Sequence, residues 1–344
     1  MKNDILSMNP EELKALITEL NEPAYRAVQI FEWLHRRGVD SFAEMDNLPK
    51  SLRAALNERC EITVCQLEES MVSEKDETHK FLFALKDGVL IESVKMKYSF
   101  GHSICISTQA GCRMGCRFCA STEGGLLRNL TAGEMCAQVY AAIPGIKKLV
   151  GIVLMGCGEP LDNFNETVKF LELICHPKGA AVGGRHITIS TCGLVPQIKE
   201  LADMKLQINL AVSLHAPDND LRKSLMPIAN RYSIEELIDA CRYYISLTNR
   251  RVTFEYALVR GHNDSHGHAA ALAKLLEGLL CHVNLIPVNE CGGKSKKFFS
   301  PTPRREAQNF SDILGKSHIQ SSIRRTIGSD VNAACGQLRA KLKD

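Results

Sequence analysis

The sequence predicts an α/β protein in which a small helical region precedes a larger parallel sheet. Beyond residue 100, helical segments alternate with apolar segments typical of strands, near residues 103–107, 148–155, 186–191, 206–213, 252–258, 281–287 and 319–325. Two of the helices begin with capping boxes, Thr131-Ala-Gly-Glu134 and Ser233-Ile-Glu-Glu236. Strands that alternate with helices form parallel βαβ units, and such a sheet is either doubly wound or curved into a barrel. In both arrangements the active site lies in the loops that follow the strands.

The chain before residue 100 divides into two further regions. Residues 1–60 are predicted to be helical, because Asn9 and Pro10 mark a capped helix start and apolar residues then recur at helical spacing. Residues 61–100 are predicted to form a β-hairpin region. Lys86-Asp87-Gly88 separates two apolar segments there, and Asp-Gly favours a type I′ turn. The third domain is expected to span residues 101–344.

The composition indicates a water-soluble protein of the cytoplasm. Apolar residues make up 45% and charged residues 24% of the chain, as in ordinary globular proteins. No apolar run approaches the length of a membrane span, and the N-terminus lacks the apolar core of a signal peptide, so no membrane association is expected. In the cytoplasm, fourteen cysteines indicate metal or redox chemistry rather than a disulfide scaffold.

Three cysteines, Cys112, Cys116 and Cys119, lie in a short polar segment with the spacing C-x3-C-x2-C. Glycine and other small residues flank them, so the segment is predicted to form a loop that can wrap a compact metal centre. Thiolates favour iron–sulfur clusters, zinc and Cu(I). Because a [4Fe–4S] cluster usually takes four thiolates, three on one loop would leave one iron free to bind another molecule.

Two other interpretations of these cysteines compete with the cluster. Zinc with a distant fourth ligand is one, although structural zinc sites favour paired cysteine knuckles and the sequence has no second knuckle. Three unconnected buried thiols are the other, since free cysteine is among the most buried residue types. The spacing favours the cluster.

Polar residues follow several of the predicted strands. Gly158 and Glu159 lie in a glycine-rich bend, where the backbone can approach a ligand closely and a carboxylate can bind an ammonium group. Ser190, the segment Ser213-Leu214-His215 and Asn289 follow later strands. Each of these residues alone is typical of a cap or a turn. Their recurrence at the same end of four strands predicts a binding site for one polar small molecule.

Three further features have both a structural and a functional interpretation. Cys335 lies between small residues on a predicted tight turn, as a packed thiol or as a nucleophile. Glu92, inside the second strand of the hairpin, is an edge residue facing water or a base, and its position alone favours water. Residues 291–344 hold eleven Lys and Arg against four Asp and Glu, which makes them a phosphate-binding face or a solvated tail.

Taken together, the three-cysteine loop, Gly156-x-Gly-Glu-Pro160 and Ala333-Ala-Cys-Gly-Gln-Leu338 resemble the radical S-adenosylmethionine (SAM) RNA methyltransferases that modify an adenine carbon, the RlmN/Cfr family. The resemblance covers essentially the whole chain. It implies a partial (β/α)6 radical-SAM barrel with a small N-terminal helical domain that binds RNA. It also implies one [4Fe–4S] cluster per subunit, held by the three cysteines and by S-adenosylmethionine.

The same resemblance implies a role for each remaining candidate. The residues that would bind S-adenosylmethionine are Gly158, Glu159, Ser190, Ser213, Leu214, His215 and Asn289. Cys335 would be methylated on sulfur by one S-adenosylmethionine, and a second would be cleaved to a radical that removes hydrogen from this methyl group. The resulting carbon radical would add to adenine. Cys105 would then form a transient disulfide with Cys335 to release the product, and Glu92 would accept the proton.

Members of the family methylate adenine at C2 or at C8. Pro160 resembles the C2 enzymes, since the C8 enzymes have alanine there. We therefore expect C2 methylation of an adenosine in 23S rRNA at the peptidyl-transferase centre and of an adenosine beside the anticodon of tRNA. The alternative is C8 methylation of 23S rRNA, which is linked to antibiotic resistance.

An electron donor such as flavodoxin or ferredoxin is expected as a partner. Cys157 and Cys192 depart from the family pattern, in which Met or Ile and Ser or Val are more familiar.

Two other classes of function share part of this pattern. A radical enzyme that acts on a peptide or a small molecule would need the cysteine loop but neither Cys335 nor a basic C-terminal segment. A zinc-dependent RNA-binding module would need only the thiols.

Overall fold

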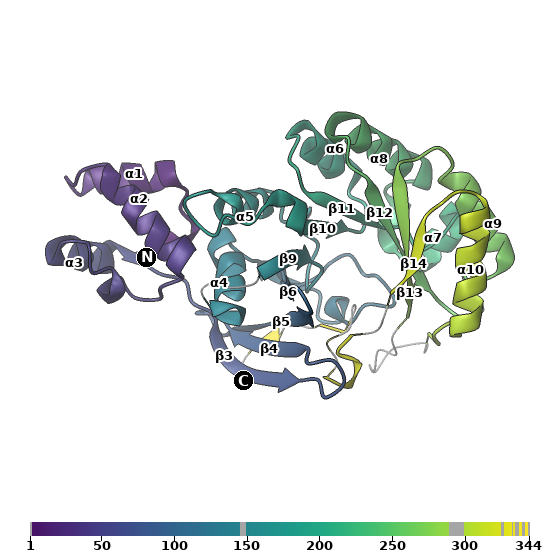
Figure 1. Cartoon of the computed structure of the whole chain (residues 1–344), viewed down its shortest axis with the longest axis horizontal. Helices are drawn as coiled ribbons and strands as arrows, with labels where there is room; N and C mark the ends of the chain where they lie inside the picture. The colour runs from purple at the N-terminus through teal and green to yellow at the C-terminus, as the bar shows by residue number, and fades with distance from the viewer. Residues whose placement is uncertain are drawn as a thin grey trace.

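The computed structural model describes residues 2–144, 149–288, 299–324, 327–331, 333, 337–338 and 341–342. Within these residues, eleven strands form one sheet in the order β14-β13-β12-β11-β10-β9-β6-β5-β4-β3, and β15 (Lys341–Leu342) pairs with β5. The terminal strands of this described sheet, β14 and β3, do not pair with each other, so the sheet stays open (Figure 1).

Seven neighbouring strands in the described part of the sheet are parallel. Most of their side chains are buried, as expected for parallel strands covered on both faces. Each overlaps one of the predicted apolar segments, so this prediction is confirmed. They are β6 (Gly101–Cys105), β9 (Leu149–Leu154), β10 (Ile187–Thr191), β11 (Asn209–Ser213), β12 (Val252–Leu258), β13 (Cys281–Pro287) and β14 (Ser321–Ile323).

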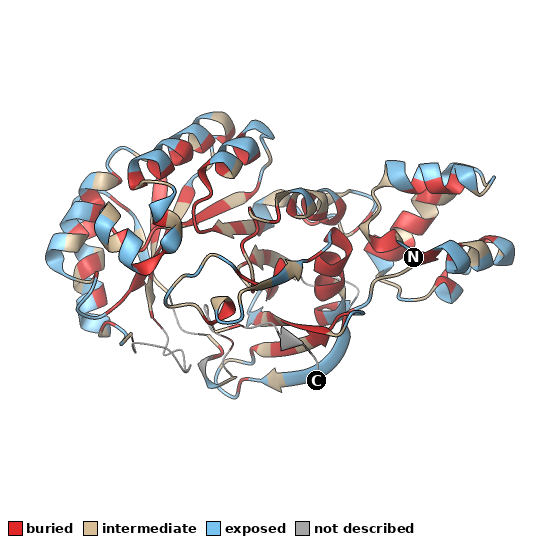
Figure 2. Cartoon of the chain, turned by 180° about the vertical axis from the view of Figure 1, so that it is seen from behind, coloured by how far each residue is buried: buried red, intermediate tan, exposed pale blue. Residues whose placement is uncertain are grey.

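Helices connect the neighbouring parallel strands and cover the sheet. Their sheet-facing sides are buried and their outer sides exposed (Figure 2). Both predicted capping boxes are present. Six strand–helix units in an open sheet confirm the partial (β/α)6 barrel. The helices are α4 (Ala132–Ala142), α5 (Phe164–Cys175), α6 (Val195–Asp203), α7 (Asn219–Leu225), α8 (Ile234–Thr248), α9 (His266–Leu275) and α10 (Arg304–Lys316). No helix of the described residues is long and apolar enough to cross a membrane.

Three antiparallel strands extend this sheet beyond β6: β5 (Val89–Tyr98), β4 (His79–Ala84) and the exposed edge strand β3 (Gln66–Val72). The predicted hairpin is present, but its turn is not type I′. That turn needs positive φ at both central residues, and here Gly88 has φ +82° while Asp87 is not in the left-handed region. Leu85 N donates to Val89 O at 2.8 Å and closes a three-residue loop instead.

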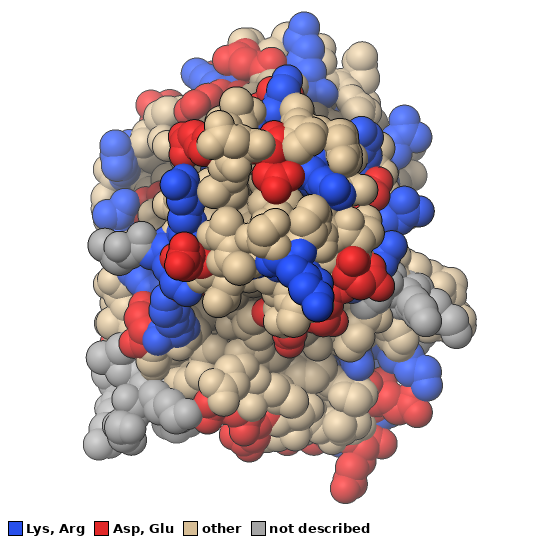
Figure 3. All heavy atoms as spheres, turned by 90° about the vertical axis from the view of Figure 1, so that its left-hand side faces the viewer, with Lys and Arg blue, Asp and Glu red and all other residues tan. Residues whose placement is uncertain are grey.

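The N-terminal region is mainly helical, as predicted, and forms a separate projection on the left of Figure 1. Asn9 caps its first helix. A parallel strand pair, β1 with β2, was not predicted. The elements are β1 (Asn3–Asp4), η1 (Ile5–Ser7), α1 (Pro10–Glu19), α2 (Tyr25–Glu32), the π-helix η2 (Trp33–Arg37), η3 (Phe42–Glu44), α3 (Lys50–Arg59) and β2 (Cys60–Glu61). On this side of the molecule, Lys and Arg are interspersed with Asp and Glu (Figure 3).

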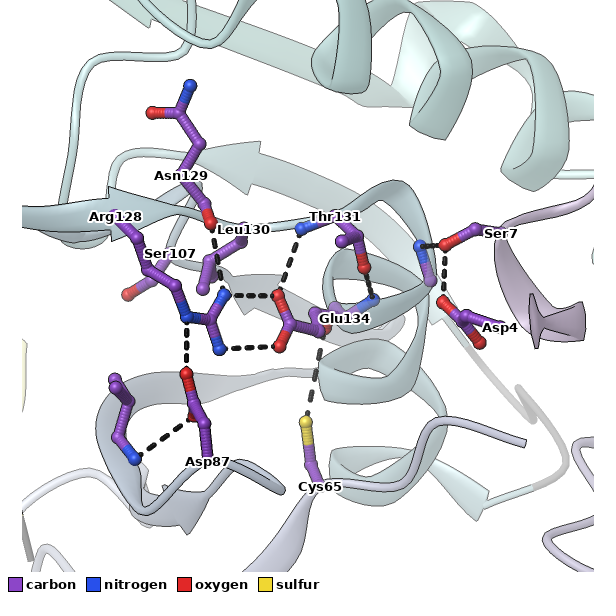
Figure 4. Close-up of polar contacts among 12 residues, drawn as sticks. Asp4, Ser7, Cys65, Asp87, Ser107, Arg128, Asn129, Leu130, Thr131 and Glu134 are labelled. Carbon is purple, nitrogen blue, oxygen red and sulfur yellow. Dashed lines mark hydrogen bonds and ion pairs between the residues drawn. The ribbon is translucent and has the colours of Figure 1, made fainter. Parts of the chain in front are cut away.

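Polar contacts join the N-terminal region and the hairpin to the start of α4 (Figure 4). Gly133 N donates to Ser7 Oγ at 2.8 Å, and Ser7 in turn donates to Asp4. Arg128 donates to both carboxylate oxygens of Glu134, at 2.7 and 2.8 Å, and also contacts Asp87 in the hairpin turn. Such bidentate pairs fix orientation as well as distance. The segment that returns from the cysteine loop is therefore held firmly.

Candidate active site

A two-stranded antiparallel ribbon carries the cysteine loop. Its strands, β7 (Gln109–Gly111) and β8 (Leu126–Asn129), were not predicted from the sequence. Cys112 N donates to Gly125 O at 2.9 Å, so the ribbon closes at the first cysteine. Gly111 has φ +81°, and a Cβ there would collide with the same carbonyl oxygen. Only glycine fits this position without strain.

The three cysteines line one cavity at the carboxyl ends of the parallel strands. Arg117 N donates to Leu225 O at 3.0 Å and holds the loop beside the end of α7. Burial raises the pKa of Cys112 to about 12 and also raises the pKa of Cys116. These thiols therefore require a bound metal to stabilise their thiolate forms.

The donor set fits an iron–sulfur cluster. Within the described residues, no three His, Cys, Asp or Glu side chains are placed to hold a single metal ion. A [4Fe–4S] cluster needs another arrangement, in which each thiolate binds its own iron atom. Cys112, Cys116 and Cys119 supply soft ligands around a common cavity, which suits such a cluster.

The glycine-rich bend after β9 packs closely against the base of the cysteine ribbon. Gly158 has φ +109°, and a Cβ there would lie 2.7 Å from Gln109 N. Gln109 N donates to Cys157 O at 3.1 Å, and Glu159 N donates to Gln109 Oε1 at 2.8 Å. Gln109 thus positions both the glycine-rich bend and the cysteine loop. Gly158 and Glu159 both line the cavity.

Glu159 is a buried carboxylate without a cation beside it in the described part of the chain. It is 4% exposed, and its oxygens accept from Leu161 N at 3.0 Å and Cys192 N at 2.7 Å. Burial raises the pKa of Glu159 in spite of these bonds. A buried carboxylate is costly unless a cation is near. The ammonium group of S-adenosylmethionine supplies such a cation, so this residue fits the implied cofactor.

Three of the predicted strand-end residues line the same cavity: Ser190, Ser213 and His215. His215 Nδ1 accepts from Ala257 N at 2.9 Å, which places the proton of the neutral ring on Nε2. Burial lowers the pKa of His215 to about 3, so the ring is neutral near pH 7. Phe118 from the cysteine loop packs edge-on against it, with ring centroids 4.8 Å apart.

Two other predicted cofactor residues stand apart from this group. Leu214 is buried, and its N–H donates to Glu255 O at 3.0 Å. It is not among the residues that line the cavity, and its side chain belongs to the apolar core. Asn289 lies outside the described residues.

Glu255 and Arg324 also line the cavity and were missed from the sequence. Glu255 is 5% exposed and accepts from Asn284 Nδ2 at 2.9 Å. Burial raises its pKa, and the charge of Arg324 opposes this rise. Glu255 could have been found from the sequence, because a glutamate inside an apolar strand such as β12 is unusual. Glu92 was singled out for the same reason.

Glu92 and Cys105 lie on one face of the antiparallel part of the sheet. Leu82 pairs with Glu92 and Val94 pairs with Cys105, so the alternation of strand side chains places both candidates on the same face. β5 is an inner strand and the Glu92 side chain is largely buried, so the interpretation of Glu92 as an edge residue facing water is wrong. Lys80 Nζ lies 2.8 Å from Glu92 Oε1, with side-chain exposures of 7% and 14%.

The described parts of the C-terminal segment pack over this face. Ala333 and Leu338 belong to one small apolar cluster with Cys105, and Ser121 Oγ donates to Leu338 O at 2.7 Å. Upstream, Asp330 accepts from Ser73 Oγ at 2.8 Å. Cys335, between these anchored positions, lies outside the described residues. The contacts bring its chain neighbours to both Cys105 and the cysteine loop.

An open (β/α)6 sheet with a three-cysteine loop at the carboxyl ends of its strands is the architecture of radical SAM proteins. Residues 106–273 match the model of the radical SAM superfamily. Residues 3–62 match a family described as the N-terminal domain of ribosomal RNA large subunit methyltransferases. A crystal structure of a radical SAM methyltransferase from Sphaerobacter thermophilus has 44% sequence identity and a TM-score of 0.93, covering 98% of this chain and 99% of that one.

Similar curated proteins identify the family within this class. A probable dual-specificity RNA methyltransferase RlmN from Clostridium novyi (strain NT) is 52% identical over 98% of both chains. One from Clostridium botulinum (strain Alaska E43 / Type E3) is 53% identical over 98% of this chain and 96% of its own. The chain belongs to the RlmN family of radical SAM RNA methyltransferases.

Proposed function

We propose that the chain methylates C2 of an adenosine in 23S rRNA and of an adenosine beside the anticodon of tRNA. The main support for this proposal is that two groups of residues are neighbours in the fold. One is the cavity with the three cysteines and Glu159, and the other is the sheet face with Glu92 and Cys105. C2 is favoured over C8 by Pro160 in the glycine-rich bend. The dual-specificity name of the relatives supports two RNA substrates.

In this proposal the cavity residues hold the cofactors. Cys112, Cys116 and Cys119 ligate the cluster, and Glu159 binds the ammonium group of S-adenosylmethionine. Ser190, Ser213 and the Nε2–H of His215 offer hydrogen bonds to its polar groups. When bound, these cofactors supply a methyl group and, in a second cycle, a radical that abstracts hydrogen. The one-electron reductant is a small carrier protein of the flavodoxin or ferredoxin kind.

The neighbouring face carries the methyl transfer. Cys335 sulfur accepts the methyl group and, after loss of one hydrogen atom, its methylene carbon adds to C2 of adenine. Glu92 takes the C2 proton, and the cluster held by the three cysteines would supply the acceptor for the one electron that is released. Cys105 thiolate then attacks Cys335 sulfur; a disulfide forms, the carbon–sulfur bond breaks, and the released carbon takes up a proton as the new methyl group. Tethering the radical to the protein gives the rate advantage of an intramolecular reaction.

Lys80 gives this face its geometry. Its ammonium group holds the Glu92 carboxylate at 2.8 Å in a nearly water-free place. Ser107 Oγ donates to Glu92 O at 2.7 Å and accepts from Cys157 N, in the glycine-rich bend, at 2.9 Å. The proton acceptor is thereby tied to the wall of the cofactor cavity.

The experiment is mass spectrometry of nucleosides from RNA incubated with the reconstituted protein, S-adenosylmethionine and a reductant. The expected product is 2-methyladenosine in 23S rRNA and in tRNA. Detection of 8-methyladenosine alone would show the C8 reaction instead. Absence of any methylated adenosine, in protein with a full cluster, would contradict the proposal.

A further inference from the structure

Arg222 is a fully buried arginine on α7 for which the proposed reaction has no role. Its exposed fraction is 0%. Nη2 donates to Cys192 O at 2.7 Å and to Ser213 O at 3.3 Å, so the guanidinium joins the ends of β10 and β11. These contacts use one of its three nitrogen atoms.

The other two nitrogen atoms, Nε and Nη1, are buried without a hydrogen-bond partner among the described residues. The groups whose negative charge would act on Arg222 are thiols, those of Cys192, Cys116 and Cys241, rather than carboxylates. Burial lowers the pKa of Arg222, but a guanidinium stays protonated in proteins. A buried cation is strongly destabilising unless an anion lies beside it. Arg222 therefore needs an anion that the described protein atoms do not supply.

The position of Arg222 indicates which anion this is. Its charge acts on Cys116, which lines the cofactor cavity, whereas Arg222 itself is not part of the cavity wall. A small molecule in the cavity does not reach the guanidinium directly. A cluster on Cys116 instead brings negative charge to a sulfur atom on which the charge of Arg222 acts.

We propose that Arg222 is the buried counter-ion of the [4Fe–4S] cluster and makes its one-electron reduction more favourable. The inference rests on the cluster of the proposed function. A cluster with three thiolates is anionic, and reduction adds a further negative charge. A fixed cation in a water-poor interior stabilises the reduced form more than the oxidised form, because the Coulomb interaction is weakly screened there. Arg222 acts through the cluster and touches neither RNA nor S-adenosylmethionine.

The test is the midpoint potential of the cluster in the reconstituted full-length protein, without RNA. Reduced cluster is measured by EPR during titration with dithionite and redox mediators. Arg222→Gln removes the charge and keeps a hydrogen-bond donor. We expect its reduction equilibrium to be about tenfold less favourable, which is about 59 mV for a one-electron couple. Arg222→Lys keeps the charge and should retain a potential close to that of the wild type.

Arg117→Gln is the matched control, because it removes an exposed cation from the cysteine loop itself. Its potential should be unchanged, since water and salt screen exposed charges. A wild-type potential in iron-loaded Arg222→Gln would overturn the inference. If Arg222→Gln binds no iron, the test rests on Arg222→Lys. An Arg222→Lys variant that binds iron fully and has the wild-type potential supports the counter-ion role. Loss of iron in both variants would show that the contacts to the two carbonyl groups matter instead. A wild-type protein without a cluster would refute the proposed function, not this inference alone.

Discussion

The two sides of the active centre treat their buried charges differently. On the cavity side, Glu159 and Arg222 are buried without an opposite charge among the described residues. On the sheet side, the buried Lys80 and Glu92 neutralise each other. Charges left uncompensated mark the places where cofactors bring the missing partner. The paired charges of Lys80 and Glu92 belong to the sheet face, which is ordered without any cofactor or RNA.

The largest expected effect is the loss of the cluster itself. Replacing Cys112, Cys116 or Cys119 with Ala should abolish iron binding and methylation together, because each thiolate ligates a separate iron. Cys175→Ala, on α5 and away from the cavity, should keep both. Iron and acid-labile sulfide are measured after anaerobic reconstitution. Full iron and sulfide in all three loop variants would show that this side is not a cluster site.

At the Lys80–Glu92 pair, replacing Lys80 alone should destabilise the protein more than replacing both residues. Lys80→Met leaves the Glu92 carboxylate buried without its ammonium partner, which typically costs about 3–5 kcal/mol of stability. Adding Glu92→Leu removes the stranded charge and should restore most of that stability, although not the activity. Urea unfolding of the three proteins provides the measurement. A Lys80→Met variant as stable as the wild type would show that the pair is not buried in solution.

The uncompensated carboxylate should control cofactor affinity. Glu159→Gln keeps the size of the side chain and removes the charge that meets the ammonium group. A hydrogen bond to a charged group is worth about 1.5–3 kcal/mol, so the Kd for S-adenosylmethionine should rise roughly 10- to 100-fold. Glu200→Gln, an exposed residue on α6, serves as the control. Isothermal titration with cluster-loaded protein measures both, and equal affinities would remove Glu159 from the binding site.

The smallest effect concerns the basic C-terminal segment. Arg304 and Arg305 are exposed at the start of α10, and Lys294, Lys296 and Lys297 lie outside the described residues. If the two arginines meet phosphates, changing both to Gln should flatten the salt dependence of RNA binding by about 0.7–0.9 per contact. Arg242→Gln on α8 is the control. An unchanged slope would make the segment an ordinary solvated surface.

The parallel sheet could be predicted because its strands are long apolar runs between recognisable helix caps. The ribbon of β7 and β8 could not, since it is short and depends on the close approach of Gly111 to Gly125. Its cysteines were nevertheless identifiable from their spacing.

Among the charged residues, Glu159 was recognisable beside glycines at a strand end. Arg222 was not, because an arginine in a short helix has the same pattern whether it faces water or the core. Whether Glu92 faces water or protein depends on β6 pairing beside β5 and on the C-terminal segment packing over this face. Local sequence does not contain these long-range contacts.

In the proposed reaction, the two sides of the active centre act in sequence through Cys335. The most direct measurement is the protein–RNA adduct formed by Cys105→Ala, mapped by mass spectrometry after nuclease digestion. Without Cys105, methylene transfer should stop after the bond to adenine forms, so an adenosine should remain attached through C2 to Cys335. Cys335→Ala should form no adduct. An adduct in Cys335→Ala, or none in an inactive, cluster-loaded Cys105→Ala, would contradict the account.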